Sequence, residues 1–299
     1  MKKYYTASLF ILFFLICETV FSFAQDSLYK LGPESQRQDG VPKGVVTKYS
    51  WERNLPGNNK NYRDYYIYVP AQYDSTKPAA LMVFQDGYAY VREDGDFRVP
   101  IVFDNLIYKK EIPVIIGLFI NPGNSSSQYP DNLFNSSDRS AEYDELSDRY
   151  VNFLIEQLIP FLKKKYNISS DPKMHAIGGI SSGGICAFTA AWQRPDYFQK
   201  VMSHVGSFTN IRGGNAYPDL IRKGAKKDIK IFMQDGSNDL QIIYGDWWLS
   251  NLQMESSLKF KGYDYKFEKG TGSHSGKHGG SILPESLIWL WSDIMKNNN

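Results

Sequence analysis

Two short, uninterrupted apolar segments constrain the fold of this chain most strongly. Residues 80–84 read ALMVF and residues 113–120 read PVIIGLFI, and both have the length of a β-strand. A strand with one face in water alternates apolar and polar residues, whereas a strand that is covered on both faces is apolar throughout. The two segments therefore predict interior strands of a sheet that has helices packed on both sides.

Strand and helix patterns then alternate along the chain. Strand patterns occupy residues 174–177, 200–205, 229–233 and 263–267, and helical patterns occupy residues 184–193, 247–260 and 283–295. This alternation predicts an α/β fold with a mostly parallel sheet. We find no internal repeat and no linker, so residues 44–299 are expected to form a single domain.

Two further elements complete the expected fold. Residues 45–51 and 65–69 are rich in β-branched and aromatic side chains, which predicts a hairpin whose turn contains residues 56–58. In residues 143–166 apolar side chains recur at spacings of three and four, which predicts a helix. Pro160 lies inside this segment and is expected to kink it.

Residues 1–24 have the pattern of a secretory signal peptide. Lys2 and Lys3 precede an apolar run at residues 9–16, and Ala24 ends a cleavage motif before Gln25. The mature protein is therefore expected in the periplasm or outside the cell, without stable membrane insertion. Residues 25–43 are polar and contain Gly and Pro, so they are interpreted as a loose N-terminal arm.

Two alternatives to cleavage stay open. An uncleaved anchor is one, but the apolar run is interrupted by Glu18 and is short for a membrane span. Lipidation at Cys17 is the other, but Ile16 is bulky for the residue before a lipidated cysteine. Beyond the leader Cys186 stands alone, so no internal disulfide is expected.

The charge balance excludes one class of partner. The chain has 34 basic and 32 acidic residues, a net charge of +2. Nucleic-acid-binding domains are strongly basic. No nucleic-acid partner is therefore expected.

Ser181 is the candidate nucleophile. It is central to the G-x-S-x-G motif at residues 179–183, between a predicted strand and a predicted helix, which is the context that this motif requires. The flanking glycines are expected because a Cβ there would collide with the strand or with the helix start. The helix N-terminus would stabilise negative charge that develops beside the serine.

The general base for Ser181 is expected to be one of the four histidines of the chain. His175 and His204 lie on predicted strands and are interpreted as core residues. His274 and His278 lie in a Gly-rich loop after the last predicted strand, at the edge where such sheets bind ligands. We favour His274 as the base because it follows the strand end more closely, and leave His278 as a substrate contact or a solvated loop residue.

A carboxylate must hold the imidazole in the useful tautomer. Asp235 and Asp239 both follow the predicted strand at residues 229–233. We favour Asp239, which can project from the turn, whereas Asp235 at the strand end is expected to cap the turn through its own backbone. The order Ser181, Asp239, His274 is that of α/β-hydrolases.

Backbone amides are expected to stabilise the oxyanion of an acyl-transfer reaction. The Ser182 amide is one candidate because it follows the nucleophile. The Tyr88 amide, in the loop after residues 80–84, is the other, although Asp86 and Gly87 also fit an ordinary turn.

No metal or organic cofactor is indicated. His274 and His278 have a metal-like spacing only on a helix, and the glycines around them disfavour one.

Arg212 and Trp247 are expected as further substrate contacts, although a surface arginine and a core tryptophan are simpler interpretations.

Several segments together resemble a known esterase family. They are GISSGG at 179–184, FQDG at 84–87, RSAEY at 139–143, GSND at 236–239 and GSH at 272–274. The family includes enterochelin esterases, feruloyl and acetyl-xylan esterases and S-formylglutathione hydrolases. The resemblance implies an α/β-hydrolase fold and a cofactor-free serine esterase with Ser181 as nucleophile, His274 as base and Asp239 as acid.

The expected reaction is hydrolysis of a carboxylic ester through an acyl-enzyme. Export and the resemblance favour acetyl or feruloyl esters of polysaccharides. Alternatives are a siderophore ester of the enterochelin type, acyl transfer to a sugar, and a catalytically silent binding protein of the same fold.

Overall fold

The structure is a computed structural model that describes residues 26–54 and 60–296. The expected leader at residues 1–24, with Cys17, and the expected turn at residues 56–58 lie outside the described residues. Within those two ranges, none of the helices combines the length and apolar character needed to cross a membrane.

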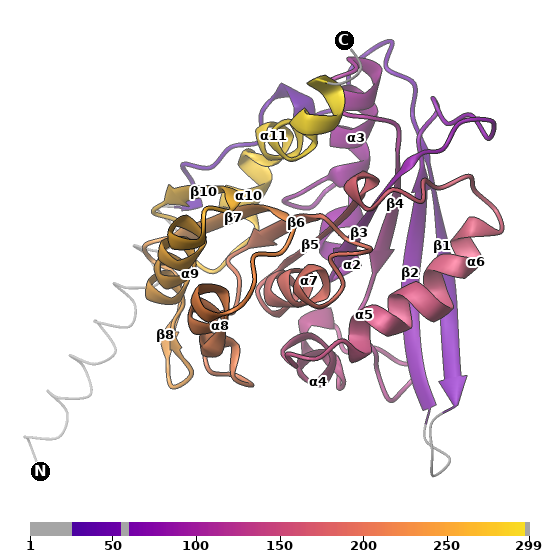
Figure 1. The fold of residues 1–299 in the computed structure, drawn as a ribbon. Helices are drawn as coiled ribbons and strands as arrows, with labels where there is room; N and C mark the ends of the chain where they lie inside the picture. Colours follow the sequence, from indigo (N-terminus) through magenta and orange to yellow (C-terminus); the bar gives the residue numbers. More distant parts are fainter. Residues whose placement is uncertain (1–25, 55–59, 297–299) are drawn as a thin grey trace, which may run out of the picture.

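A sheet of eight strands forms the centre of the molecule (Figure 1). Its order is β1-β2-β4-β3-β5-β6-β7-β10, with β2 antiparallel to both of its neighbours and the remaining pairs parallel. This arrangement confirms the predicted mostly parallel α/β sheet and the predicted hairpin. The strands are β1 (Val45–Asn54), β2 (Lys60–Val69), β3 (Ala80–Gln85), β4 (Ile115–Ile120), β5 (His175–Ile180), β6 (Lys200–His204), β7 (Lys230–Gly236) and β10 (Asp264–Gly270).

Helices cover both faces of this sheet (Figure 1). Alternate residues of β3 point to opposite faces, so Leu81 and Val83 join one buried cluster and Met82 and Phe84 the other. The first cluster contains side chains from α5 (Arg149–Phe153), α7 (Ser182–Gln193), α8 (Tyr217–Lys223) and α9 (Trp247–Lys261). The second contains side chains from α2 (Gly87–Val91), α3 (Val99–Tyr108) and α11 (Leu283–Lys296).

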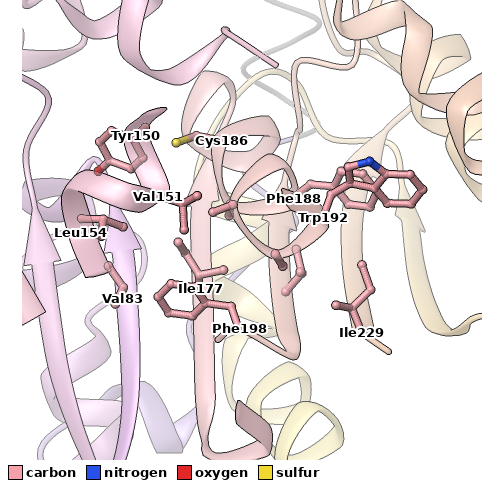
Figure 2. Packing of buried hydrophobic residues seen from close by; sticks show 14 of the residues in the cluster. Val83, Tyr150, Val151, Leu154, Ile177, Cys186, Phe188, Trp192, Phe198 and Ile229 are labelled. Carbon is pink, nitrogen blue, oxygen red and sulfur yellow. The ribbon is translucent and has the colours of Figure 1, made fainter. Parts of the chain in front are cut away.

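The helix α7 packs through the centre of the first cluster. Figure 2 shows Phe188 and Trp192 of this helix on the same side of the sheet as Ile177 of β5. Cys186 also lies here, buried and unpaired. Because α7 begins directly after β5, this packing fixes the direction of the turn between them.

The helix expected at residues 143–166 begins later than predicted and contains a π-helical segment before Pro160. The separate helix α4 (Arg139–Tyr143) precedes it, and α5 runs into the π-helical η4 (Leu154–Leu158) and then into α6 (Ile159–Lys163). Pro160 is the second residue of α6 and has no N–H to donate. The wider π-turn directly before it accommodates the missing hydrogen bond.

The segment before β1 is an arm, but the expectation that it is loose is wrong. The buried Asn105 of α3 donates from Nδ2 to the carbonyl oxygens of Glu34 (2.8 Å) and Gln36 (2.9 Å). Arg37 donates to the buried carboxylate of Asp104 at 2.5 Å. Polar groups of the arm therefore find fixed partners on α3, which a composition argument cannot detect.

Candidate active site

Ser181 occupies a strained turn between β5 and α7. Its φ of 58° and ψ of −120° are unusual for a residue with a Cβ. The surrounding backbone holds this conformation, since the Ser181 amide donates to the His204 carbonyl (2.9 Å) and its carbonyl accepts from Gly184 (2.9 Å) and Ser207 (3.1 Å). The hydroxyl therefore projects above the end of the sheet.

The glycines around Ser181 are required by space. A Cβ on Gly179 would lie 2.3 Å from the carbonyl oxygen of Gly183, and a Cβ on Gly183 would lie 2.7 Å from Oδ2 of Asp86. Neither glycine has a positive φ. The predicted collision with the helix start is confirmed for Gly179, whereas Gly183 is confined by a side chain of the loop after β3.

The structure brings Ser181, His274 and Asp239 together. Nε2 of His274 lies 2.8 Å from Oγ of Ser181, and Nδ1 lies 2.5 Å from Oδ1 of Asp239. The three residues follow the carboxyl ends of β5, β10 and β7, which meet at one edge of a parallel sheet. The imidazole can donate from Nδ1 to the carboxylate and accept the serine proton at Nε2.

The environment keeps His274 uncharged. Burial lowers the pKa of its imidazole to about 4, and the positive charge of the Arg139 guanidinium acts in the same direction. A neutral ring has a free lone pair at Nε2 at neutral pH. The residue is therefore in the protonation state that a general base needs.

Asp235 lies beside Asp239, the carboxylate that is hydrogen-bonded to His274. The buried carboxyl group of Asp235 accepts hydrogen bonds from the Gly236 amide (2.7 Å) and from Nδ2 of Asn251 (2.8 Å). Burial and the neighbouring Asp239 carboxylate raise the pKa of Asp235 to about 9. The raised pKa favours the protonated form of Asp235 beside the Asp239 carboxylate, a role beyond the predicted turn cap.

Ser207, which sequence reasoning missed, contacts the nucleophile. Its Oγ lies 3.2 Å from Oγ of Ser181 and accepts a hydrogen bond from Nε1 of Trp247 at 3.1 Å. Trp247 is only 2% exposed and packs edge-on against His274 at 5.7 Å. Trp247 is thus buried as packing for the histidine and is not among the residues that line the cavity, and its expected contact with substrate stays a prediction.

The two backbone amides that were predicted to stabilise the oxyanion differ in their hydrogen-bond partners. Among the described residues, none accepts a hydrogen bond from the Ser182 amide at the start of α7. The Tyr88 amide instead donates to Oδ1 of Asn121 at 3.0 Å. Tyr88 is thus not a free donor here, since the side chain of Asn121 caps the first turn of α2.

A cavity of about 550 Å³ opens onto Ser181 and His274. Tyr88, Phe97 and Phe134 are the aromatic members of its lining. The complete lining is Tyr88, Ala89, Arg92, Gly95, Asp96, Phe97, Phe134, Arg139, Ile180, Ser181, His274, Ser275 and Gly276. The cavity therefore offers aromatic surface and charged groups beside the nucleophile.

Arg139 is a charged residue of this cavity that is held by an ion pair and by an aromatic ring. Its Nε and one terminal nitrogen donate to Asp86 at 2.8 and 2.7 Å, and its guanidinium lies over the Phe134 ring at 5.0 Å. Asp86 is fully buried. The pair joins the loop after β3 to α4 beneath the serine turn.

The remaining predicted contacts lie outside the cavity lining. His278 is 6% exposed, its Nδ1 lies 2.9 Å from Nε2 of Gln234, and its ring stacks on Tyr29. It belongs to the short helix α10 (Lys277–Ser281), which the glycines were expected to prevent. Arg212 is exposed and donates to Oγ of Ser140 at 3.3 Å. The expectation that these two residues touch substrate is therefore not supported by their positions.

Sequence comparison matches residues 59–281 to the model of a family described as Putative esterase. A curated relative, the "Uncharacterized protein YbbA" of Bacillus subtilis strain 168, is 23% identical over 249 residues, which cover 80% of this chain and 96% of the relative.

Solved structures of similar fold are esterases. The enterobactin esterase of Shigella flexneri matches with a TM-score of 0.65 and 18% identity over 89% of this chain, and this chain spans 64% of its length. A ferulic acid esterase of the fungus Anaeromyces mucronatus matches with a TM-score of 0.66 and 15% identity over 89% of this chain and 99% of the fungal protein. These likenesses show that the fold is shared.

Proposed function

Because the chain belongs to the Putative esterase family and is a carboxylesterase by that membership, we propose that it cleaves esters through an acyl-enzyme on Ser181. The observation that carries this mechanism is the pair of hydrogen bonds that His274 makes, with Ser181 at 2.8 Å and with Asp239 at 2.5 Å. Nucleophile, base and orienting acid are the three parts that covalent ester hydrolysis needs.

In the first half of the reaction, Nε2 of His274 takes the hydroxyl proton while Oγ of Ser181 attacks the ester carbonyl. The Ser182 amide and the N-terminus of α7 stabilise the oxyanion that forms. His274 then gives the proton to the leaving alcohol, and the acyl group stays on Ser181. Asp239 stabilises the charged imidazolium during the transfer.

In the second half, water replaces the alcohol. His274 removes a proton from the water, the resulting hydroxide attacks the acyl carbonyl, and the acid leaves as Oγ recovers its proton. Acyl transfer to a sugar would follow the same path, with a sugar hydroxyl in place of water.

The proposed substrates are acetyl or feruloyl esters of polysaccharides. The aromatic lining of the cavity supports an acyl or sugar group that packs against rings. The ferulic acid esterases among the similar structures support the same class. A siderophore ester is the second candidate, supported by the enterobactin esterase fold.

A hydrolysis panel distinguishes these substrates. We expect wild-type protein to release acetate from acetylated xylan or ferulate from methyl ferulate, and Ser181→Ala to release neither. Faster cleavage of a catecholate trilactone than of both other esters would favour the siderophore candidate. Failure to cleave any ester would contradict the proposed function, and acylated sugar products would indicate transfer.

Export is part of the proposal. The signal-peptide pattern of residues 1–24 supports it, as does a polymer substrate that would lie outside the cell. N-terminal sequencing of the protein from the periplasm or medium should begin at Gln25. Recovery from the cytoplasm with residues 1–24 intact would contradict export.

A further inference from the structure

The N-terminal arm reaches the loop that presents the proposed base. We propose that Asp26 and Tyr29 are positioning residues for His274, so that the arm forms part of the active site although it lies far away in the sequence. This inference rests on the proposed esterase function of the Ser181 site.

Asp26 binds the loop on both sides of His274. Its Oδ1 accepts from the Ser273 amide at 3.0 Å, and its Oδ2 accepts from the hydroxyls of Ser273 (2.6 Å) and Ser275 (3.0 Å). The two serines are the chain neighbours of His274. One carboxylate therefore fixes the backbone before the histidine and the side chains that flank it.

The environment of Asp26 favours its ionised form. The side chain is buried, with the residue only 6% exposed. Burial raises the pKa of its carboxyl group, but hydrogen bonds from Ser273 and Ser275 and the charge of Lys277 outweigh this and lower the pKa below its ordinary value. Hydrogen bonds to such a carboxylate are stronger than those between neutral groups.

Tyr29 holds the start of the same loop. Its hydroxyl accepts a hydrogen bond from the Thr271 amide at 2.8 Å, and its ring stacks on His278 with centroids 4.2 Å apart. A Cβ on Gly270 would lie 2.4 Å from the Tyr29 hydroxyl. The tyrosine thus lies between the end of β10 and the helix α10, which are the two ends of the loop.

The composition of the loop explains why it needs external contacts. Residues 270–276 contain Gly270, Gly272 and Gly276, and glycine loses more conformational entropy on ordering than any other residue. The imidazole must nevertheless keep two hydrogen bonds at once. A displacement of about 1 Å in a catalytic group can lower the rate about 100-fold.

The test is a steady-state comparison with 4-nitrophenyl acetate as the probe ester. The variants are Asp26→Ala, Asp26→Asn and Tyr29→Phe of the full chain. We expect Asp26→Ala to lower kcat roughly 10- to 100-fold with KM within about threefold. Asp26→Asn keeps one acceptor for the Ser273 amide and should recover part of kcat. The matched control is Asp39→Ala, which removes an exposed carboxylate from the same arm and should retain wild-type kcat.

Each outcome decides one question. Wild-type kcat in both Asp26→Ala and Tyr29→Phe would overturn the inference, as would an equal loss in Asp39→Ala. If Asp26→Ala does not fold at the assay temperature, kcat of the volume-conserving Asp26→Asn and Tyr29→Phe decides, and wild-type values in both would overturn the inference. A wild-type protein that cleaves no ester would instead refute the proposed function.

Discussion

Nε2 of His274 lies 2.8 Å from Oγ of Ser181, although 93 residues separate them in the chain. The opposite nitrogen of the same ring is bonded to Asp239, so the ring cannot turn without losing a second hydrogen bond. This relationship sets both the tautomer of the imidazole and the direction in which the serine proton moves.

Replacing Asp239 by Asn should disable the base without disturbing the cavity. The amide can donate to Nδ1, which would place the imidazole proton on Nε2, where it cannot accept from Ser181. We expect kcat to fall by about 10⁴-fold, as for the equivalent change in a serine protease triad. Steady-state kinetics check this, with Asp39→Asn as an exposed control. Loss of less than about tenfold would show that another carboxylate orients His274.

The activity should extend to lower pH than an ordinary histidine allows. Burial lowers the pKa of His274 from 6.5 to about 4, so the ring stays unprotonated as the pH falls through 6.5. Burial raises the pKa of Asp239 to about 6, so protonation of this partner begins first. We therefore expect kcat/KM to begin to fall below about pH 7, as Asp239 takes up a proton, and to keep falling to about pH 4. A midpoint at pH 6.5 or above would contradict this environment.

The protonated state of Asp235 predicts an unusual dependence of stability on pH. The pKa of its carboxyl group is about 9 in the folded protein and near 3.8 when unfolded, so the folded state keeps a proton that the unfolded state releases. The contribution to the free energy of unfolding therefore falls as pH rises from about 4 to 9. Asp235→Asn has no such proton.

Thermal melts of wild type and Asp235→Asn test this point. The Tm of the variant relative to wild type should increase steadily between pH 5 and pH 9, whatever its offset at pH 5. A Tm difference that stays constant over this range would mean that Asp235 is ionised in the fold.

The turn around Ser181 should not tolerate a methyl group at Gly179. The added Cβ would lie 2.3 Å from a backbone oxygen, so β5 and α7 would have to separate. We expect Gly179→Ala to lower the free energy of unfolding by about 2 kcal/mol or more. Gly32→Ala is the matched control, because no atom lies within 4 Å of its added Cβ. Equal urea midpoints for the two variants would refute the steric explanation.

The sequence alone predicts those elements whose signals lie within a short stretch of residues. Uninterrupted apolar segments marked β3 and β4, and the residues around Ser181 marked the serine turn. The α3 helix was not predicted, because nine of its ten residues are buried and it has no polar face to reveal a helical period.

The parts of the site that the sequence missed depend on contacts between distant segments. Trp247 is not a surface ring because it packs on His274, and the proton on Asp235 depends on burial beside Asp239. The contact between Asp26 and Ser273 spans 247 residues. No periodicity or motif encodes such a contact, so only the folded chain reveals it.

Covalent labelling of Ser181 tests the central claim most directly. A fluorophosphonate probe followed by intact-mass and peptide analysis should add one phosphonyl group to wild-type protein, on Ser181, and none to Ser181→Ala. His274→Ala should react far more slowly, because the serine proton would have no acceptor. A wild-type protein that stays unlabelled, or that carries the group on another residue, would contradict the account.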